Sequence, residues 1–252
     1  MASPESITIN DEPVATGSFS AAHATHVGRV RTENQDAAWA SAEAGRALLV
    51  VADGMGGYQG GAAASTTATQ LVRERLEQTA PDSAPDMESA FSAVADVVAE
   101  AAPDGGTTLV VAVITPELVD VWHVGDSRAY LLRDDALIRV TSDHSWVQGL
   151  VDSGQLTSEQ AARHPRRNVL LRAIGKGRES NPSHSAMRFM AGDVLLLCSD
   201  GLHGVVPDPE IAAIMKTRSD LADMAQALID AALDLGAPDN IGVALGSWTV
   251  SE

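Results

Sequence analysis

Five short stretches of the chain place an aspartate beside a glycine or a small polar residue, and these aspartates are the residues best suited to chemistry. The stretches are residues 31–36, 53–57, 125–128, 199–202 and 239–241. Asp53, Asp126 and Asp200 each follow a strongly apolar run. Such a run predicts a buried strand that brings a carboxylate to its end.

Several carboxylates in one place would repel one another unless cations lay between them. Carboxylate, carbonyl and water oxygens are ligands that suit Mn²⁺ or Mg²⁺ better than zinc or copper. Two such ions roughly 3.5–4 Å apart can activate water and neutralise phosphate oxygens. The sequence therefore predicts a multi-metal site, and hydrolysis of a phosphate ester is a reaction that such a site performs.

Other kinds of phosphate chemistry find no support in the sequence. The single cysteine, Cys198, lies in an apolar run and is expected to be a small buried hydrophobe. A cysteine phosphatase needs an arginine six positions later, where this chain has Gly204. The Asp-x-Asp motif of haloacid-dehalogenase phosphatases, the nucleotide-binding Gly-x-x-x-x-Gly-Lys loop and a His-Glu-x-x-His metal motif are also missing from the sequence.

The elements that position these aspartates follow from hydrophobic periodicity. Apolar runs predict strands at residues 18–26, 47–52, 107–114, 118–124, 129–133, 136–140, 194–198 and 241–250. Helical spacing predicts helices over residues 61–78 and 87–101 and a last one that starts at Ser219. The turns between residues 107 and 140 are too short for parallel crossovers, so we expect one antiparallel meander there. These elements predict an α+β fold.

Length and charge narrow the function classes further. The 252 residues fit one domain, which we expect over residues 17–252 after a disordered tail at residues 1–16. A net charge of −17 argues against nucleic acid and anionic membranes as partners. The sequence has no signal-peptide pattern and no apolar stretch near the ~20 residues that span a bilayer, so we expect a cytoplasmic protein.

In this order, the five stretches resemble the PP2C-type (PPM family) metal-dependent serine/threonine protein phosphatases, bacterial branch. The resemblance extends from about Thr25 to Trp248 and includes residues 106–108, 141–145 and 164–175. It implies a four-layer α-β-β-α sandwich with two central antiparallel sheets. It also implies hydrolysis of phosphoserine and phosphothreonine in proteins by a metal-activated water. The expected partners are phosphorylated proteins, including a serine/threonine kinase that the enzyme opposes, and we expect a monomer.

The resemblance also assigns metal ligands. It implies that Asp53 bridges two Mn²⁺ or Mg²⁺ ions and that the backbone carbonyl of Gly54 binds the second ion. Asp200 and Asp239 would complete the first. Asp126 matches a position that helps to bind a third ion together with Asp200.

Two further residues receive roles from the same resemblance. Arg31 is the candidate phosphate clamp, because a guanidinium can grip two phosphate oxygens at once. Asp36 would hold the waters around the ions. The proton donor to the leaving group stays open, because Met55 stands where some relatives carry a histidine. His144 and His164 are candidates only by default.

Asp143 is expected to be structural, and residues 145–180 match the mobile flap beside the active site in this family. A flap over a shallow site would govern substrate choice. Two alternatives remain at this point. One is a phosphatase dedicated to a sigma-factor regulator, and the other is a catalytically weak or inactive regulator that binds phosphoproteins.

Overall fold

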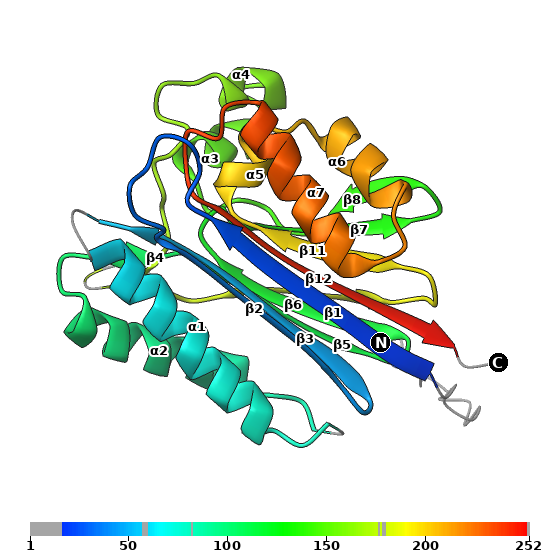
Figure 1. The fold of residues 1–252 in the computed structure, drawn as a ribbon. Coiled ribbons are helices and arrows are strands. Elements are labelled where there is room, and N and C mark those ends of the chain that lie inside the picture. The colour runs from blue at the N-terminus through cyan, green and yellow to red at the C-terminus, as the bar shows by residue number, and fades with distance from the viewer. Residues whose placement is uncertain (1–16, 57–59, 82, 176, 178–179, 251–252) are drawn as a thin grey trace, which may run out of the picture.

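Two antiparallel sheets pack face to face, and helices cover the outer face of each sheet (Figure 1). The computed structural model describes residues 17–56, 60–81, 83–175, 177 and 180–250. The predicted tail at residues 1–16 lies outside the described residues. Within this part of the chain, no helix combines the length and the apolar character needed to cross a membrane.

The first sheet has five strands, and all neighbouring strands are antiparallel. Their order is β1 (Gly17–His26), β12 (Ile241–Val250), β11 (Val194–Cys198), β7 (Arg128–Arg133) and β8 (Ala136–Arg139). The first and last strands of the domain therefore pair with each other, with His26 opposite Ile241.

The second sheet has seven strands. Its main path is β10 (Ser183–Arg188), β6 (Leu118–Val124), β5 (Leu109–Thr115), β3 (Arg46–Met55), β4 (Gly106–Thr107) and β9 (Ile174–Gly175), and β2 (Asp36–Glu43) pairs with β3. In the β2–β3 register, Asp36 lies directly opposite Asp53. The sheet itself thus brings two of the predicted site residues together.

The prediction of one meander between residues 107 and 140 is wrong. Strands β5 and β6 form a hairpin in the seven-stranded sheet, whereas β7 and β8 form a hairpin in the five-stranded sheet. The chain passes from one sheet to the other at Gly125–Ser127, where Gly125 has a φ of +101°. Short connections were compatible with both arrangements, and the strands β2 and β10 were not predicted.

Two groups of helices form the outer layers. Helices α1 (Gly60–Gln78) and α2 (Met87–Ala101) cover the seven-stranded sheet, and α6 (Asp208–Lys216) and α7 (Leu221–Asp234) cover the five-stranded one (Figure 1). The side chain of Asp220, rather than the predicted Ser219, caps α7 by accepting hydrogen bonds from two backbone N–H groups. The short α3 (Trp146–Asp152), α4 (Ser158–Ala162) and α5 (Asp200–His203) lie at one end of the sandwich.

Three apolar layers separate the four structural layers. Along β3, Leu48 and Val50 pack against the α1–α2 side, while Leu49 and Val51 pack between the sheets. Strand β11 alternates in the same way, and Cys198 lies fully buried on its helix side. Burial on both faces explains why these strands are continuous apolar runs in the sequence. The predicted four-layer α+β sandwich is confirmed.

Candidate metal centre

The five predicted aspartates come from five different places in the fold and meet at one end of the sandwich. Asp36 opens β2, Asp53 lies near the end of β3, and Asp126 lies in the turn between β6 and β7. Asp200 opens α5, and Asp239 lies just before β12. We call these residues the aspartate cluster.

Asp53 is the centre of the aspartate cluster. Its carboxyl group hydrogen-bonds with the carboxyl groups of Asp36 and Asp200. Burial raises the pKa of Asp53 well above its ordinary value, and the charges of Asp36, Asp200, Asp126 and Asp239 raise it further. In the protein alone, ionisation of this carboxyl group is therefore strongly opposed.

The neighbouring carboxyl groups respond in the same direction. Burial raises the pKa of Asp36 to about 7 and that of Asp200 to about 6, with added repulsion from the other aspartates. The pKa of Asp126 rises to about 8, again mainly through burial and then through the charge of Asp200. A cation between these groups would reverse all of these shifts.

Hydroxyl groups hold the backbone of Asp53 in place. Its N–H donates to Thr108 Oγ1 at 2.9 Å, and its carbonyl oxygen accepts from Thr107 Oγ1 at 3.0 Å. Thr108 Oγ1 also lies 2.6 Å from Ser127 Oγ, beside Asp126. Both threonines are buried. The family resemblance included residues 106–108 but gave these threonines no part in positioning Asp53.

Gly54 lies where the backbone has room for no side chain. A Cβ atom there would collide with the carbonyl oxygens of Gly61 and Gln35. The Gly54 N–H donates to Gln35 O at 3.0 Å. The N-terminal turn of α1 and the loop before β2 therefore press directly against the residue predicted to offer its carbonyl to a metal ion.

Asp36 is held by a serine that the sequence did not single out. Ser199 Oγ donates to Asp36 Oδ2 at 2.6 Å and accepts from the Gly242 N–H at 2.8 Å. Asp36 is only 8% exposed and Ser199 is fully buried. This serine therefore ties β2 to β11 and β12 at the base of the aspartate cluster.

Arg31 and Asp239 form an ion pair at the open side of the site. Arg31 Nη2 lies 2.8 Å from Asp239 Oδ2, and the Arg31 side chain is 54% exposed. The predicted phosphate clamp and a predicted metal ligand are thus in contact. An exposed pair of this kind is weak and can be exchanged for other partners.

The loop that carries Arg31 is fastened by a buried amide, Asn240. Asn240 Nδ2 donates to the carbonyl oxygens of Val27 and Glu33, both at 2.8 Å, and Asn240 Oδ1 accepts from the Gln35 N–H at 2.8 Å. The sequence contained Asn240 within a motif but did not indicate this role. Its position next to Asp239 was visible in the sequence, but its burial and its distant partners were not.

Asp126 is placed by two neutral histidines. His203 Nε2 donates to the Asp126 carbonyl oxygen at 3.1 Å, and burial lowers the pKa of His203 to about 3. His144 Nδ1 accepts from the Gly125 N–H, and burial together with the nearby His123 lowers the pKa of His144 to about 4. His144 thus supports the turn. The other default candidate, His164, packs against Trp146 in the flap region.

Asp143 is paired with arginines, as expected of a structural residue. Arg128 donates two hydrogen bonds to its carboxylate, at 3.0 and 2.8 Å, and Arg139 donates another. Burial alone would raise the pKa of Asp143, but these hydrogen bonds and charges lower it below the ordinary value.

A cavity of about 380 Å³ opens beside the aspartate cluster. Asp126, Asp200 and Asp239 line one side, and the flap contributes Val147 and Arg167 among others. Arg167 lies close enough to lower the pKa of Asp200. The predicted flap therefore lies beside the carboxylates, where it can contact a bound substrate.

The donor set suits hard divalent cations. Within the described ranges, no three His, Cys, Asp or Glu side chains already surround a common point in the way that ligands surround an ion. The carboxyl group of Asp53 instead contacts those of Asp36 and Asp200, and the carboxylate of Asp239 pairs with Arg31. These are buried carboxyl oxygens whose pKa values are raised and which have few positively charged side chains beside them. Such oxygens suit Mn²⁺ or Mg²⁺ as ligands.

Known proteins show the same organisation. The family model for protein phosphatase 2C matches residues 25–235. The serine/threonine phosphatase stp of Listeria innocua is 37% identical over 233 residues, which cover 88% of this chain and 92% of that protein. The serine/threonine protein phosphatase PstP of Mycobacterium tuberculosis is 38% identical over 227 residues, which cover 86% of this chain and 42% of that protein.

A solved structure agrees with these relatives. The catalytic domain of PstP in complex with two manganese ions matches with a TM-score of 0.79 and 33% identity, and the match covers 93% of this chain and all of that one. This chain belongs to the protein phosphatase 2C family. The predictions of a PP2C-type enzyme, of serine/threonine protein phosphatase activity and of its fold are therefore confirmed, and the two alternative functions gain no support.

Proposed function

We propose that this protein phosphatase hydrolyses phosphoserine and phosphothreonine in proteins at the aspartate cluster, with two Mn²⁺ or Mg²⁺ ions and a third near Asp126. When bound, such ions lower the pKa of water and neutralise charge on phosphate oxygens. The observation that carries the proposal is the convergence of buried carboxyl groups around Asp53, whose pKa values are raised by burial and then by the charges of the neighbouring aspartates.

Each residue of the site has one role in this proposal. Asp53, the Gly54 carbonyl, Asp200 and Asp239 bind the two ions, and Asp126 binds the third together with Asp200. Asp53 is suited to the shared position, because its carboxyl group already contacts those of two other aspartates.

Arg31 and Asp36 act on substrate and water. Arg31 exchanges its exposed contact with Asp239 for the phosphate group, which it can hold through two parallel hydrogen bonds. Asp36, fixed by Ser199, orients water at the base of the site. Arg167 of the flap lines the same cavity and lies close enough to Asp200 to lower its pKa.

The cellular setting follows the same reasoning. Phosphoproteins are the substrates, and we include among them the serine/threonine kinase that the enzyme opposes. One chain supplies every residue of the proposed site, so a monomer suffices. The lone thiol, Cys198, is buried and suits a reducing compartment such as the cytoplasm.

Hydrolysis of a phosphothreonine peptide tests the proposal. The protein is assayed with Mn²⁺, with Mg²⁺ or with EDTA, and Asp239→Ala is assayed beside it. We expect phosphate release that needs the metal and that the substitution abolishes. Binding of Mn²⁺ without release of phosphate from this peptide or from a small aryl phosphate would contradict the proposal.

A further inference from the structure

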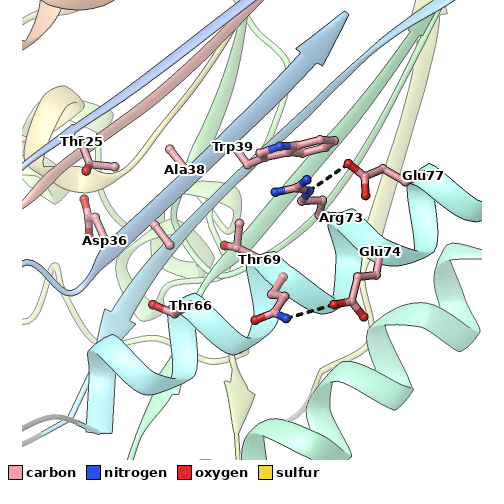
Figure 2. Close-up of a pocket in the computed structure, with 11 residues that line it drawn as sticks. Thr25, Asp36, Ala38, Trp39, Thr66, Thr69, Arg73, Glu74 and Glu77 are labelled. Atoms are coloured by element: carbon pink, nitrogen blue, oxygen red, sulfur yellow. Dashed lines mark hydrogen bonds and ion pairs between the residues drawn. The ribbon is translucent and has the colours of Figure 1, made fainter. Parts of the chain in front are cut away.

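A second concave region lies outside the aspartate cluster. A groove of about 640 Å³ runs between helix α1 and strand β2. Figure 2 shows its lining, with Trp39 on β2 facing α1 and with Asp36 and Thr66 at the end away from Glu77. The groove therefore starts at a residue of the aspartate cluster and leads away from it along α1.

The far end of the groove carries negative charge. Glu77 Oε1 accepts from Arg73 Nε at 2.9 Å, and Glu74 Oε1 accepts from Gln70 Nε2 at 3.0 Å. The Arg73 guanidinium lies 5.3 Å from the centroid of the Trp39 ring. Arg73 thus offsets the charge of Glu77 and stacks over Trp39, whereas Glu74 accepts from a neutral amide, so the far end of the groove keeps a net negative charge.

Thr69 in the middle of the groove has an unused hydroxyl group. The residue is 8% exposed, and its Oγ1 has no hydrogen-bond partner among the described residues. An unpaired buried hydroxyl destabilises the fold, and a valine of the same shape would avoid this cost. Because Thr69 lines the groove, an occupant could supply the missing partner.

Strand β2 offers backbone groups on the same side of the molecule. It pairs with β3, and the Ala40 N–H points away from that ladder to His23 Nδ1 at 3.2 Å. Because these directions alternate along a strand, the Ala38 N–H points the same way as that of Ala40. Ala38 lines the groove, so an extended peptide there can hydrogen-bond with β2.

From these observations we infer that the groove is a docking site for an extended segment of the phosphoprotein substrate that carries lysine or arginine. The inference rests on the proposed function and names a feature of its substrates. Charge decides the occupant. The chain's own residues 1–16 contain acidic residues and no lysine or arginine, and a second copy carries a net charge of −17.

The length of the groove sets the spacing. From Thr66 to Glu77, α1 rises by about 17 Å, which about five extended residues span. Because Asp36 marks the near end, the basic residues should lie roughly five to eight positions from the phosphorylated residue.

Paired peptides test the inference. Each phosphothreonine peptide carries a pair of lysines about six positions from the phosphothreonine, on either its N-terminal or its C-terminal side. In the matched control peptide, two serines replace the two lysines. For one side, we expect kcat/KM of the wild type to favour lysine by about three- to tenfold at low salt, the range that two exposed ion pairs support. High salt should reduce this preference.

Variants assign the preference to the groove. Glu74→Lys with Glu77→Lys should remove it, whereas Asp96→Lys with Glu100→Lys, the same charge change on exposed positions of α2, should keep it. Thr69→Val should fold normally and lower the preference about two- to threefold. Hydrolysis of a small aryl phosphate should stay unchanged in all of these variants.

The outcomes separate this inference from the proposed function. The docking site is overturned if kcat/KM is equal for lysine and serine peptides, or if the preference survives the Glu74 and Glu77 changes. Continued hydrolysis of the aryl phosphate would show in the same experiment that the proposed enzymatic activity is unaffected. Should no phosphate be released from any substrate, fluorescence anisotropy of a labelled non-phosphorylated lysine peptide still tests the groove. Binding that the α1 variant does not weaken would then refute it.

Discussion

The buried Asp143 and the aspartate cluster lie at the same end of the molecule but differ in what neutralises their carboxyl groups. Asp143 accepts hydrogen bonds from Arg128 and Arg139, and its pKa lies below the ordinary value. Asp53 instead hydrogen-bonds with Asp36 and Asp200, and the pKa of all three is raised. Burial acts on both groups, so the difference comes from their neighbours.

This difference separates structure from function. Where the chain places guanidinium groups inside the fold, as at Asp143, the carboxylate is satisfied and only holds elements together. Where it does not, the carboxyl groups destabilise the metal-free fold and can bind a cation from outside. Arg31 pairs with Asp239 from the exposed rim and so leaves the inner carboxyl groups available.

The largest expected effect is the loss of activity when the central carboxyl group of the aspartate cluster is removed. Asp53→Asn should reduce metal-dependent hydrolysis of a phosphothreonine peptide by at least about 10³-fold, because a reacting centre loses one of its main electrostatic groups. In EDTA the variant should be at least as stable as the wild type, since the most strongly opposed charge is gone. Steady-state kinetics and urea unfolding measure both effects. Activity close to that of the wild type would remove Asp53 from the site.

The structural role of Asp143 should be visible in the free energy of unfolding. Asp143→Asn leaves Arg128 and Arg139 without their shared partner and should cost about 3–5 kcal/mol of unfolding free energy. Glu77→Gln is the control, because it removes an exposed ion pair and should cost less than about 1 kcal/mol. Urea unfolding in EDTA measures both. If Asp143→Asn costs no more than Glu77→Gln, the Arg128–Asp143 pair does not stabilise the fold.

Arg31→Lys sharpens the comparison at the rim. A lysine keeps the charge but cannot bind two phosphate oxygens through a planar fork. We expect kcat/KM for the phosphopeptide to fall about 10- to 100-fold, with little change in stability, because the pair with Asp239 is exposed. Arg29→Lys, two residues earlier, is the matched control and should leave the kinetics within about twofold. Equal losses in both variants would deny Arg31 a specific contact with phosphate.

Much of this arrangement was predictable from local patterns. Long apolar runs indicated β3, β11 and β12, and helical spacing indicated α1 and α2, with the bounds of α2 and β12 as observed. The positions of Asp53 and Asp200 were equally visible, because each follows a continuous apolar run that burial of the strand on both faces produces. The family resemblance, and not periodicity, supplied the four layers.

The remaining features depend on contacts between distant residues. Ser199 reaches Asp36 across 163 positions, and Asn240 reaches Val27 across 213. No local pattern encodes such pairs. The prediction that β7 and β8 continue the sheet of β5 and β6 failed for the same reason, because a short turn at Gly125 fits a hairpin and a crossing between sheets equally well.

The dependence of stability on pH separates Asp126 from Asp143. In the metal-free fold the pKa of Asp126 is about 8, above its ordinary value of 3.8. Between these values the folded state keeps a proton that the unfolded state releases, so this residue's contribution to stability is present at low pH and is lost as pH rises toward 8. Asp126→Asn removes that dependence.

Urea unfolding in EDTA at pH 5, 6.5 and 8 tests this expectation. The stability of Asp126→Asn relative to the wild type should increase with pH, and because both proteins contain the same histidines, their titration cancels in the difference. For Asp143→Asn the difference should stay nearly constant over this range, because the lowered pKa of Asp143 keeps it ionised in both states. At pH 8, added Mn²⁺ should stabilise the wild type more than Asp126→Asn. With the ion bound, the Asp126 carboxylate acts as a ligand and no longer destabilises the fold. Parallel pH curves for the two variants would mean that Asp126 is neutralised within the fold in the way that Asp143 is, and that it is not a metal ligand.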